Sequence, residues 1–181
     1  MLKNFSDLEE LRSKTTYLSE EILLKNTPEI LWPFISNTDI VNFEIGLNPS
    51  EYSFENHSQG GTRMFVKSKE MGMKIVYEEL PFEWLAPSYL AVERIFSQGP
   101  LKYLRFEAKL KSLETETQVK LTLAFVPLLP VFVVSKVLEN TMHKMIKLYQ
   151  EIDDKASHRA EINASVFLED PALYQEKINT L

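Results

Sequence analysis

A stretch in the second half of the chain decides the fold; residues 101–156 read LKYLRFEAKLKSLETETQVKLTLAFVPLLPVFVVSKVLENTMHKMIKLYQEIDDKA. Apolar and polar side chains alternate over 101–111 and again over 116–125, which is the pattern of strands with one dry and one wet face. Residues 131–156 follow two prolines and contain no glycine or proline. Their apolar side chains recur at the spacing of one helical face, at Val134, Leu138, Met142, Met145, Tyr149 and Ile152.

Toward the N-terminus, similar patterns predict further strands at residues 16–25, 51–56, 62–69, 73–79 and 88–96. Thr27-Pro28-Glu29 predicts the start of a short helix, because threonine caps helices and proline fits the first helical position. A second short helix is expected from Thr38. This order of elements predicts an α+β helix-grip fold, in which a curved antiparallel sheet of about seven strands wraps around the long C-terminal helix.

The length of 181 residues is that of one domain. We expect residues 1–15 to form an N-terminal arm or short helix and residues 16–156 to form the helix-grip domain. Residues 157–181 are expected to be a C-terminal extension or linker. They are too apolar for a pure linker, so they either pack back on the domain or bind a protein partner or a downstream domain.

The composition excludes several classes of function. The formal charge of −6 argues against a nucleic acid partner and against docking on an anionic membrane by charge. The absence of cysteine excludes disulfides and thiolate chemistry. The longest apolar stretch, 121–134, is interrupted by prolines and is too short to be an integral membrane segment. With no secretory signal at the N-terminus, we expect a cytoplasmic protein.

No residues suggest a metal, a cofactor or a catalytic motif. The three histidines, His57, His143 and His158, show no ligand spacing, and we expect them to be exposed or capped. Three acidic doublets are interpreted as solvated faces, namely Glu9-Glu10, Glu20-Glu21 and Asp153-Asp154. The sequence therefore predicts no catalytic residue, metal or cofactor.

A curved sheet closed by one helix has a concave apolar face that a single helix does not fill. The remaining space holds either large side chains or a hydrophobic small-molecule ligand. The alternating and helical patterns predict which side chains would line such a ligand site: Met64, Val66, Met73, Ile75, Tyr77, Glu79, Val92, Arg94, Phe106, Leu121, Leu123, Leu138, Met142, Met145 and Tyr149. The alternative is that these residues are simply core.

Glu79 and Arg94 are the polar members of this set. Glu79 shares a strand face with Ile75 and Tyr77, and Arg94 shares one with Val92, so an inward pair on consecutive strands is expected. Such a pair could hold the polar end of an amphipathic ligand. The competing interpretation is a pair at the rim of the sheet or two exposed charges.

Several stretches resemble the START-type, birch-pollen-allergen-like superfamily, also called SRPBCC. They are NTPEILWPFISNTDIVNFEIGLNP (26–49), GGTRMFV (60–66), EELPFEWLAP (78–87) and ERIFSQGPLKYLRFEAKL (93–110). The resemblance implies a pocket between sheet and helix for lipids, polyketides, quinones or hormones. Glu93-Arg94 followed by Gly99-Pro100-Leu101 also resembles the domain at the N-terminus of some bacterial class III adenylate cyclases.

Three functions therefore stay open at this point. The first is a binding module for a hydrophobic or amphipathic molecule, which would act as a sensory or regulatory module. The second is a polyketide cyclase or dehydratase that uses Glu79, Arg94, Tyr77 and Tyr103. The third is a regulatory interaction domain of a nucleotide cyclase, with a filled core.

Overall fold

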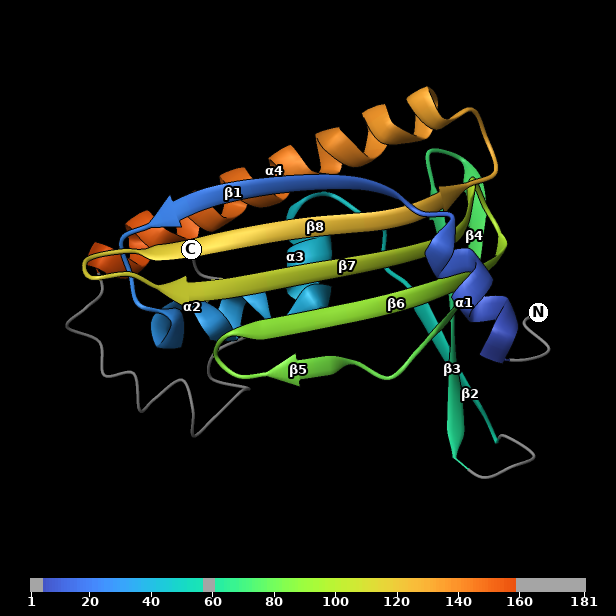
Figure 1. Cartoon of the computed structure of the whole chain (residues 1–181), viewed down its shortest axis with the longest axis horizontal. Coiled ribbons are helices and arrows are strands. Elements are labelled where there is room, and N and C mark those ends of the chain that lie inside the picture. The colour runs from blue at the N-terminus through green and yellow to red at the C-terminus, as the bar shows by residue number, and fades with distance from the viewer. Residues whose placement is uncertain (1–4, 57–60, 159–181) are drawn as a thin grey trace.

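The computed structural model describes residues 5–56 and 61–158, and an antiparallel sheet forms its centre (Figure 1). Its strands lie in the order β1-β8-β7-β6-β4-β3-β2, and β5 also pairs with β6. The strands are β1 (Thr16–Leu24), β2 (Glu51–Asn56), β3 (Thr62–Glu70), β4 (Met73–Glu79), β5 (Glu83–Leu85), β6 (Tyr89–Gln98), β7 (Leu101–Ser112) and β8 (Thr117–Pro127). With the long final helix, this arrangement confirms the predicted α+β helix-grip fold.

The strand register sets two chemically different faces of the sheet. In the centre, Val92 of β6 stands opposite Phe106 of β7, and Phe106 stands opposite Leu123 of β8. These three side chains contribute to the main apolar core. Because side chains alternate along a strand, their sequence neighbours point to the other, outer face.

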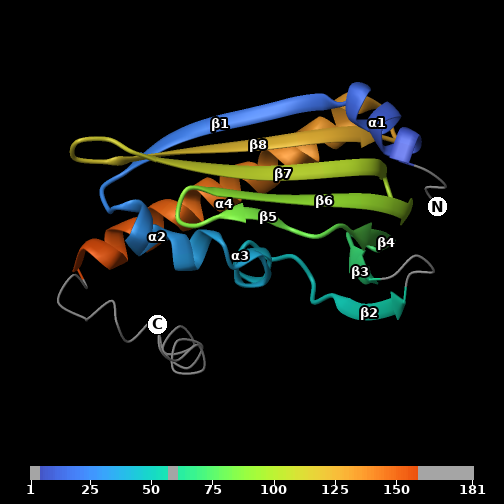
Figure 2. The same ribbon diagram turned by 60° about the horizontal axis from the view of Figure 1, so that its bottom comes forward.

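Helix α4 (Val131–His158) crosses the concave face of the sheet, as Figure 2 shows. The apolar stripe predicted for it packs into the main core with residues of β1, β6, β7 and β8. Helices α2 (Pro28–Ile35) and α3 (Thr38–Glu44) lie on the same face. Leu31, Trp32 and Ile35 of α2 are buried in that core.

Helix α1 (Phe5–Ser13) lies on the opposite, convex face. Leu8 and Leu11 of this helix pack against Ile95, Tyr103 and Val126, which form a second, smaller apolar cluster. The N-terminal residues that the structure describes therefore form a packed helix.

Asp153 departs from the prediction that the acidic doublets are solvated. Its carboxylate is buried and accepts hydrogen bonds from the backbone N–H groups of Lys25 and Asn26, at 2.8 and 2.9 Å, and from the Asn26 side chain at 2.7 Å. Asp153 is buried because the backbone N–H groups of the turn between β1 and α2 belong to neither a strand pair nor a helix and need hydrogen-bond acceptors. Asp154, its neighbour, is exposed as predicted.

Strand β5 was not predicted. It is only three residues long and begins directly after Pro81 and Phe82, so no alternation is visible in the sequence. The strand forms because it pairs with β6, where Trp84 stands opposite Leu90. The sheet therefore has eight strands where about seven were expected.

Candidate functional site

Glu79 and Arg94 form an ion pair on the concave face of the sheet. They stand directly opposite each other on β4 and β6, and the Arg94 Nε donates to the Glu79 Oε2 at 2.7 Å. Their side chains are 5% and 19% exposed, respectively. The predicted inward pair is thus present. Desolvation lowers the pKa of Arg94, but the Tyr77 and Glu79 oxygens outweigh it and raise that pKa overall, so the guanidinium is charged.

Aromatic side chains surround this pair. The Arg94 guanidinium carbon lies 5.0 Å from the centre of the Tyr77 ring, a cation–π contact. The Tyr77 ring in turn lies 5.2 Å from that of Phe96. Burial raises the pKa of the Tyr77 phenol. The polar end of the concave face therefore carries a cation, a carboxylate and a neutral phenol within an aromatic wall.

Helix α3 reaches the same region through a contact that no sequence pattern predicts. The Tyr52 hydroxyl of β2 donates to the Asp39 carboxylate of α3 at 2.7 Å. Burial, followed by this hydrogen bond, raises the pKa of Tyr52 well above its ordinary value. The pair joins the outermost strand to the helix that faces it, and only the folded structure brings these distant residues together.

Three apolar side chains on the concave side of the sheet are not fully buried. Phe106 and Phe96 belong to the inner strands β7 and β6, yet both stay partly exposed, as does Leu138 of α4. An inner strand that is covered on one side by a helix normally buries such side chains completely. Apolar surface is therefore accessible beside the Glu79–Arg94 pair.

The hydroxyl of Tyr149 is another polar group in an apolar environment. Its side chain is 1% exposed, in the main core. Its hydroxyl has no hydrogen-bond partner among the described residues. Burial raises the pKa of this phenol, so it stays protonated. A buried hydroxyl without a partner costs free energy, and a bound acceptor or donor would remove that cost.

Most of the predicted ligand-site residues share one region. Val92, Leu121, Leu123, Met142, Met145 and Tyr149 are buried in the main core, with Phe106 and Leu138 packed against it. Val66, Ile75 and Tyr77 form an adjoining cluster, against which Met64 packs. Met73 does not join them, because it lies beside the β3–β4 turn with 41% of its surface exposed. The ligand-binding role of the set stays a prediction.

Tyr103 was wrongly grouped with the inward polar residues. It lies on the convex face, where its hydroxyl donates to Glu93 at 2.6 Å. The alternation along β7 separates it from Phe106, so it cannot share the concave site. A hollow of about 380 Å³ opens on this convex face, lined by Arg12, Thr15, Tyr17, Glu83, Glu93, Tyr103, Arg105, Glu107, Thr122 and Ala124.

The charged side chains in this convex hollow pair with one another. Arg12 donates to Glu93 through Nε and Nη2, at 3.0 and 2.7 Å, and Arg105 bonds Glu83 and Glu107. The Arg105 Nη1 also lies 3.1 Å from Glu93. Because the guanidinium groups are already satisfied by carboxylates, we interpret this network as a clamp between α1, β5 and the sheet.

No group of histidine or acidic side chains within the described ranges could hold a metal ion. His143 is exposed on α4, as predicted, and His57 lies outside the described residues. None of the helices in residues 5–56 and 61–158 is both long enough and apolar enough to span a bilayer.

Comparison with known proteins shows the fold. Neither a family model nor a curated protein matches the chain. Among solved structures, the Zhui aromatase/cyclase from Streptomyces sp. R1128 matches with a TM-score of 0.54 and 12% identity, over 83% of this chain and 98% of that one. A START superfamily protein from Mycobacterium smegmatis matches with a TM-score of 0.56 and 12% identity, over 77% and 98%. The structure of Ara h 8.0201 matches with a TM-score of 0.53 and 16% identity, over 76% of this chain and 97% of that one.

Identities this low show a shared fold and leave the function open. The chain has the helix-grip fold of the START-type, birch-pollen-allergen-like proteins, as the resemblance in the sequence predicted.

Proposed function

We propose that the protein binds a hydrophobic or amphipathic small molecule between the sheet and α4. The observation that carries the proposal is the partly exposed apolar surface of Phe96 and Phe106 on inner strands, next to a desolvated ion pair. Ligand sites are typically apolar with a few placed polar groups, which is this combination. Solved structures of the same fold include a START superfamily protein, which supports the proposal.

Arg94 is the residue that we expect to select the ligand's polar end. The one hydrogen bond it makes within the described residues uses its Nε, so its two terminal nitrogens remain to donate. A guanidinium presents these donors as a fork that suits a carboxylate, a phosphate or a pair of keto oxygens. An apolar chain would lie along Phe106 and Leu138. The expected class is therefore an amphipathic molecule with an anionic or multiply oxygenated end.

The chain supplies a matched control for this assignment. Arg63 and Glu78 form a similar ion pair on neighbouring strands β3 and β4, and their side chains are 22% and 14% exposed. Arg63 and Glu78 point to the convex face, because the alternation along β4 separates Glu78 from Glu79. Replacing Arg63 should change the overall charge as Arg94→Gln does without touching the proposed site.

The experiment measures binding of the anionic apolar probe 1-anilinonaphthalene-8-sulfonate by fluorescence titration, with native mass spectrometry of the purified chain alongside. We expect the wild type and Arg63→Gln to bind alike and Arg94→Gln to bind roughly tenfold more weakly, since it removes a charged donor. Equal loss in both variants would indicate a general charge effect. Retained affinity in Arg94→Gln, with no co-purified molecule in the wild type, would contradict the proposal.

A cyclase activity is the second candidate, favoured by the match to the Zhui aromatase/cyclase. Arg94 and Tyr77 would then donate hydrogen bonds to the keto oxygens of a bound polyketide, and the Glu79 carboxylate would accept the proton from the carbon between two keto groups. Tyr103 no longer belongs to this set. Product formation from an activated poly-β-keto thioester, lost in Glu79→Gln, would support it. The regulatory role beside a nucleotide cyclase stays a prediction, as does partner binding by the tail, because residues 159–181 lie outside the described residues.

A further inference from the structure

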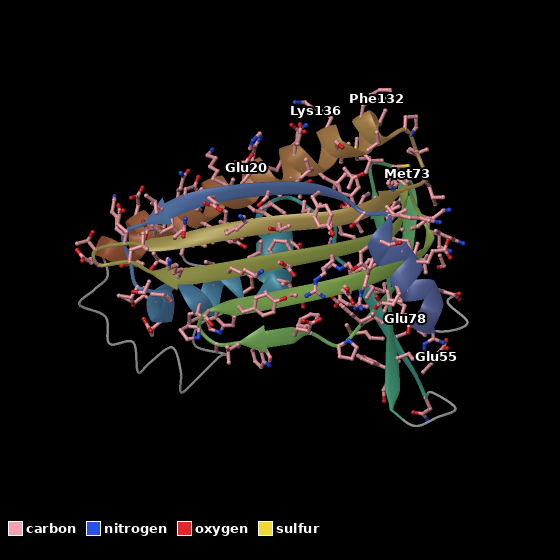
Figure 3. The ribbon with its side chains drawn as sticks, in the orientation of Figure 1. Glu20, Glu55, Met73, Glu78, Phe132 and Lys136 are labelled. Carbon is pink, nitrogen blue, oxygen red and sulfur yellow. The ribbon has the colours of Figure 1, made fainter. Side chains whose placement is uncertain are left out.

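Three connections of the chain meet at one end of the molecule. The backbone N–H of Leu128, between β8 and α4, donates to the Pro100 carbonyl in the β6–β7 turn at 2.8 Å. That turn also lies beside the start of β4, because Gln98 pairs with Val76. The β3–β4 turn, with Met71, is the third connection. Figure 3 shows the labelled Met73 and Phe132 toward this end of the long axis, with Lys136 about one turn further along α4.

This end exposes large apolar side chains. Phe132 is 74% exposed and Met71 is 78% exposed. The others with large exposed areas here are Met73, Leu128, Leu129, Val131, Val133 and Val137. We call these eight residues the apolar end surface. Gatherings of this kind on a soluble domain generally mark an interaction site.

The charge around the apolar end surface is opposite to that of the whole chain. Residues 69–74, 98–102 and 127–137 contain four lysines, Lys69, Lys74, Lys102 and Lys136, and one acid, Glu70. Four positive and one negative charge give +3 in these ranges; Glu139, which lies 3.8 Å from Lys136 on the next turn of α4, lowers the local charge to +2, against −6 for the chain. Glu70 is moreover engaged by the Asn48 backbone N–H at 3.1 Å. The whole-chain balance, which argued against an anionic membrane, therefore does not describe this end.

We propose that the apolar end surface docks on an anionic lipid bilayer, with Phe132 and its neighbours inserted among the acyl chains and the lysines at the headgroups. Apolar side chains rimmed by cations are the features by which peripheral proteins bind such surfaces. A symmetric dimer through the same surface would bring the lysines of two copies together, which is unfavourable. The docking goes beyond the proposed ligand binding and does not depend on it.

The test is co-sedimentation of the full chain with sucrose-loaded vesicles. One set of vesicles contains phosphatidylcholine alone, and the other contains phosphatidylcholine with about 30% of the anionic lipid phosphatidylglycerol. We expect binding to the anionic vesicles only. Phe132→Asp should weaken it by roughly tenfold or more, and Lys74→Gln or Lys136→Gln by about fivefold each. Trp84→Asp, on β5, is the matched control, because Trp84 is 67% exposed but lies outside this surface. It should bind like the wild type.

A second readout locates the inserted residue. A tryptophan placed by Phe132→Trp should be quenched by brominated lipids, whereas wild-type Trp84 should not. Four results would overturn the proposal: no binding to anionic vesicles, binding unchanged in Phe132→Asp, equal loss in Trp84→Asp, or a Phe132-dependent dimer in light scattering. The last would assign the surface to a second copy of the chain.

Discussion

Glu93 and Arg94 are adjacent in the chain, yet their side chains lie on opposite faces of the sheet and belong to separate networks. Glu93 accepts from Arg12 and Tyr103 on the convex face, whereas Arg94 bonds Glu79 on the concave face. The alternation of β6 thus divides two neighbouring charges between a structural clamp and a candidate binding site. Substitutions at these two positions should therefore have different consequences.

Glu93→Ala should lower the free energy of unfolding by about 3 kcal/mol, as is typical when one partner of a buried charge network is removed. The Glu93 carboxylate is buried, and its loss leaves Arg12, Tyr103 and Arg105 without their shared acceptor. Urea denaturation provides the measurement. Glu9→Ala is the control, because Glu9 is an exposed partner of the same Arg12 and should change stability by less than about 0.5 kcal/mol. Similar losses in both variants would contradict the clamp.

The same carboxylate should make stability depend on pH in the acid range. Burial raises the pKa of Glu93, but hydrogen bonds from Arg12 and Tyr103 outweigh it and lower that pKa overall. A lowered pKa in the folded state means that the stabilisation is present above the unfolded-state pKa of about 4.3 and is lost as the pH falls through the folded-state value. The stability difference between the wild type and Glu93→Gln should therefore shrink below about pH 4. A difference that stays constant from pH 7 to pH 3 would exclude this linkage.

Asp153→Ala should lower the free energy of unfolding by about 2 to 3 kcal/mol, since it leaves buried N–H donors of the β1–α2 turn unsatisfied. It removes the acceptor for Lys25 and Asn26 and with it a link between α4 and that turn. Thermal and urea unfolding measure the effect. Asp154→Ala, which removes an exposed carboxylate, should have little effect. If both variants unfold alike, the buried contacts of Asp153 do not stabilise the fold as described.

The sequence predicted those features that follow from periodicity. The alternation of side chains along β7 and β8 and the apolar face of α4 predicted that Phe106, Leu123 and Met142 lie in the interior. The alternation along β4 and β6 predicted the pairing of Glu79 with Arg94. Other contacts depend on how distant segments meet. Tyr52 can donate a hydrogen bond to Asp39 only when α3 lies beside β2. Asp153 is buried because backbone N–H groups of a turn more than a hundred residues away need hydrogen-bond acceptors. No local pattern encodes such meetings.

Tyr149→Phe should leave the free energy of unfolding unchanged or raise it by about 1 kcal/mol, because it removes a buried hydroxyl that has no partner within the described residues. The matched change Tyr103→Phe removes a hydroxyl that donates to Glu93, so it should destabilise by about 1 to 2 kcal/mol. Urea denaturation of the two variants gives the comparison. If the concave site takes a ligand that bonds this hydroxyl, Tyr149→Phe should also weaken binding of the co-purified molecule while Tyr103→Phe should not. Destabilisation by Tyr149→Phe in ligand-free protein would mean that the hydroxyl is already satisfied inside the fold, and the case for Tyr149 as a ligand contact would fail.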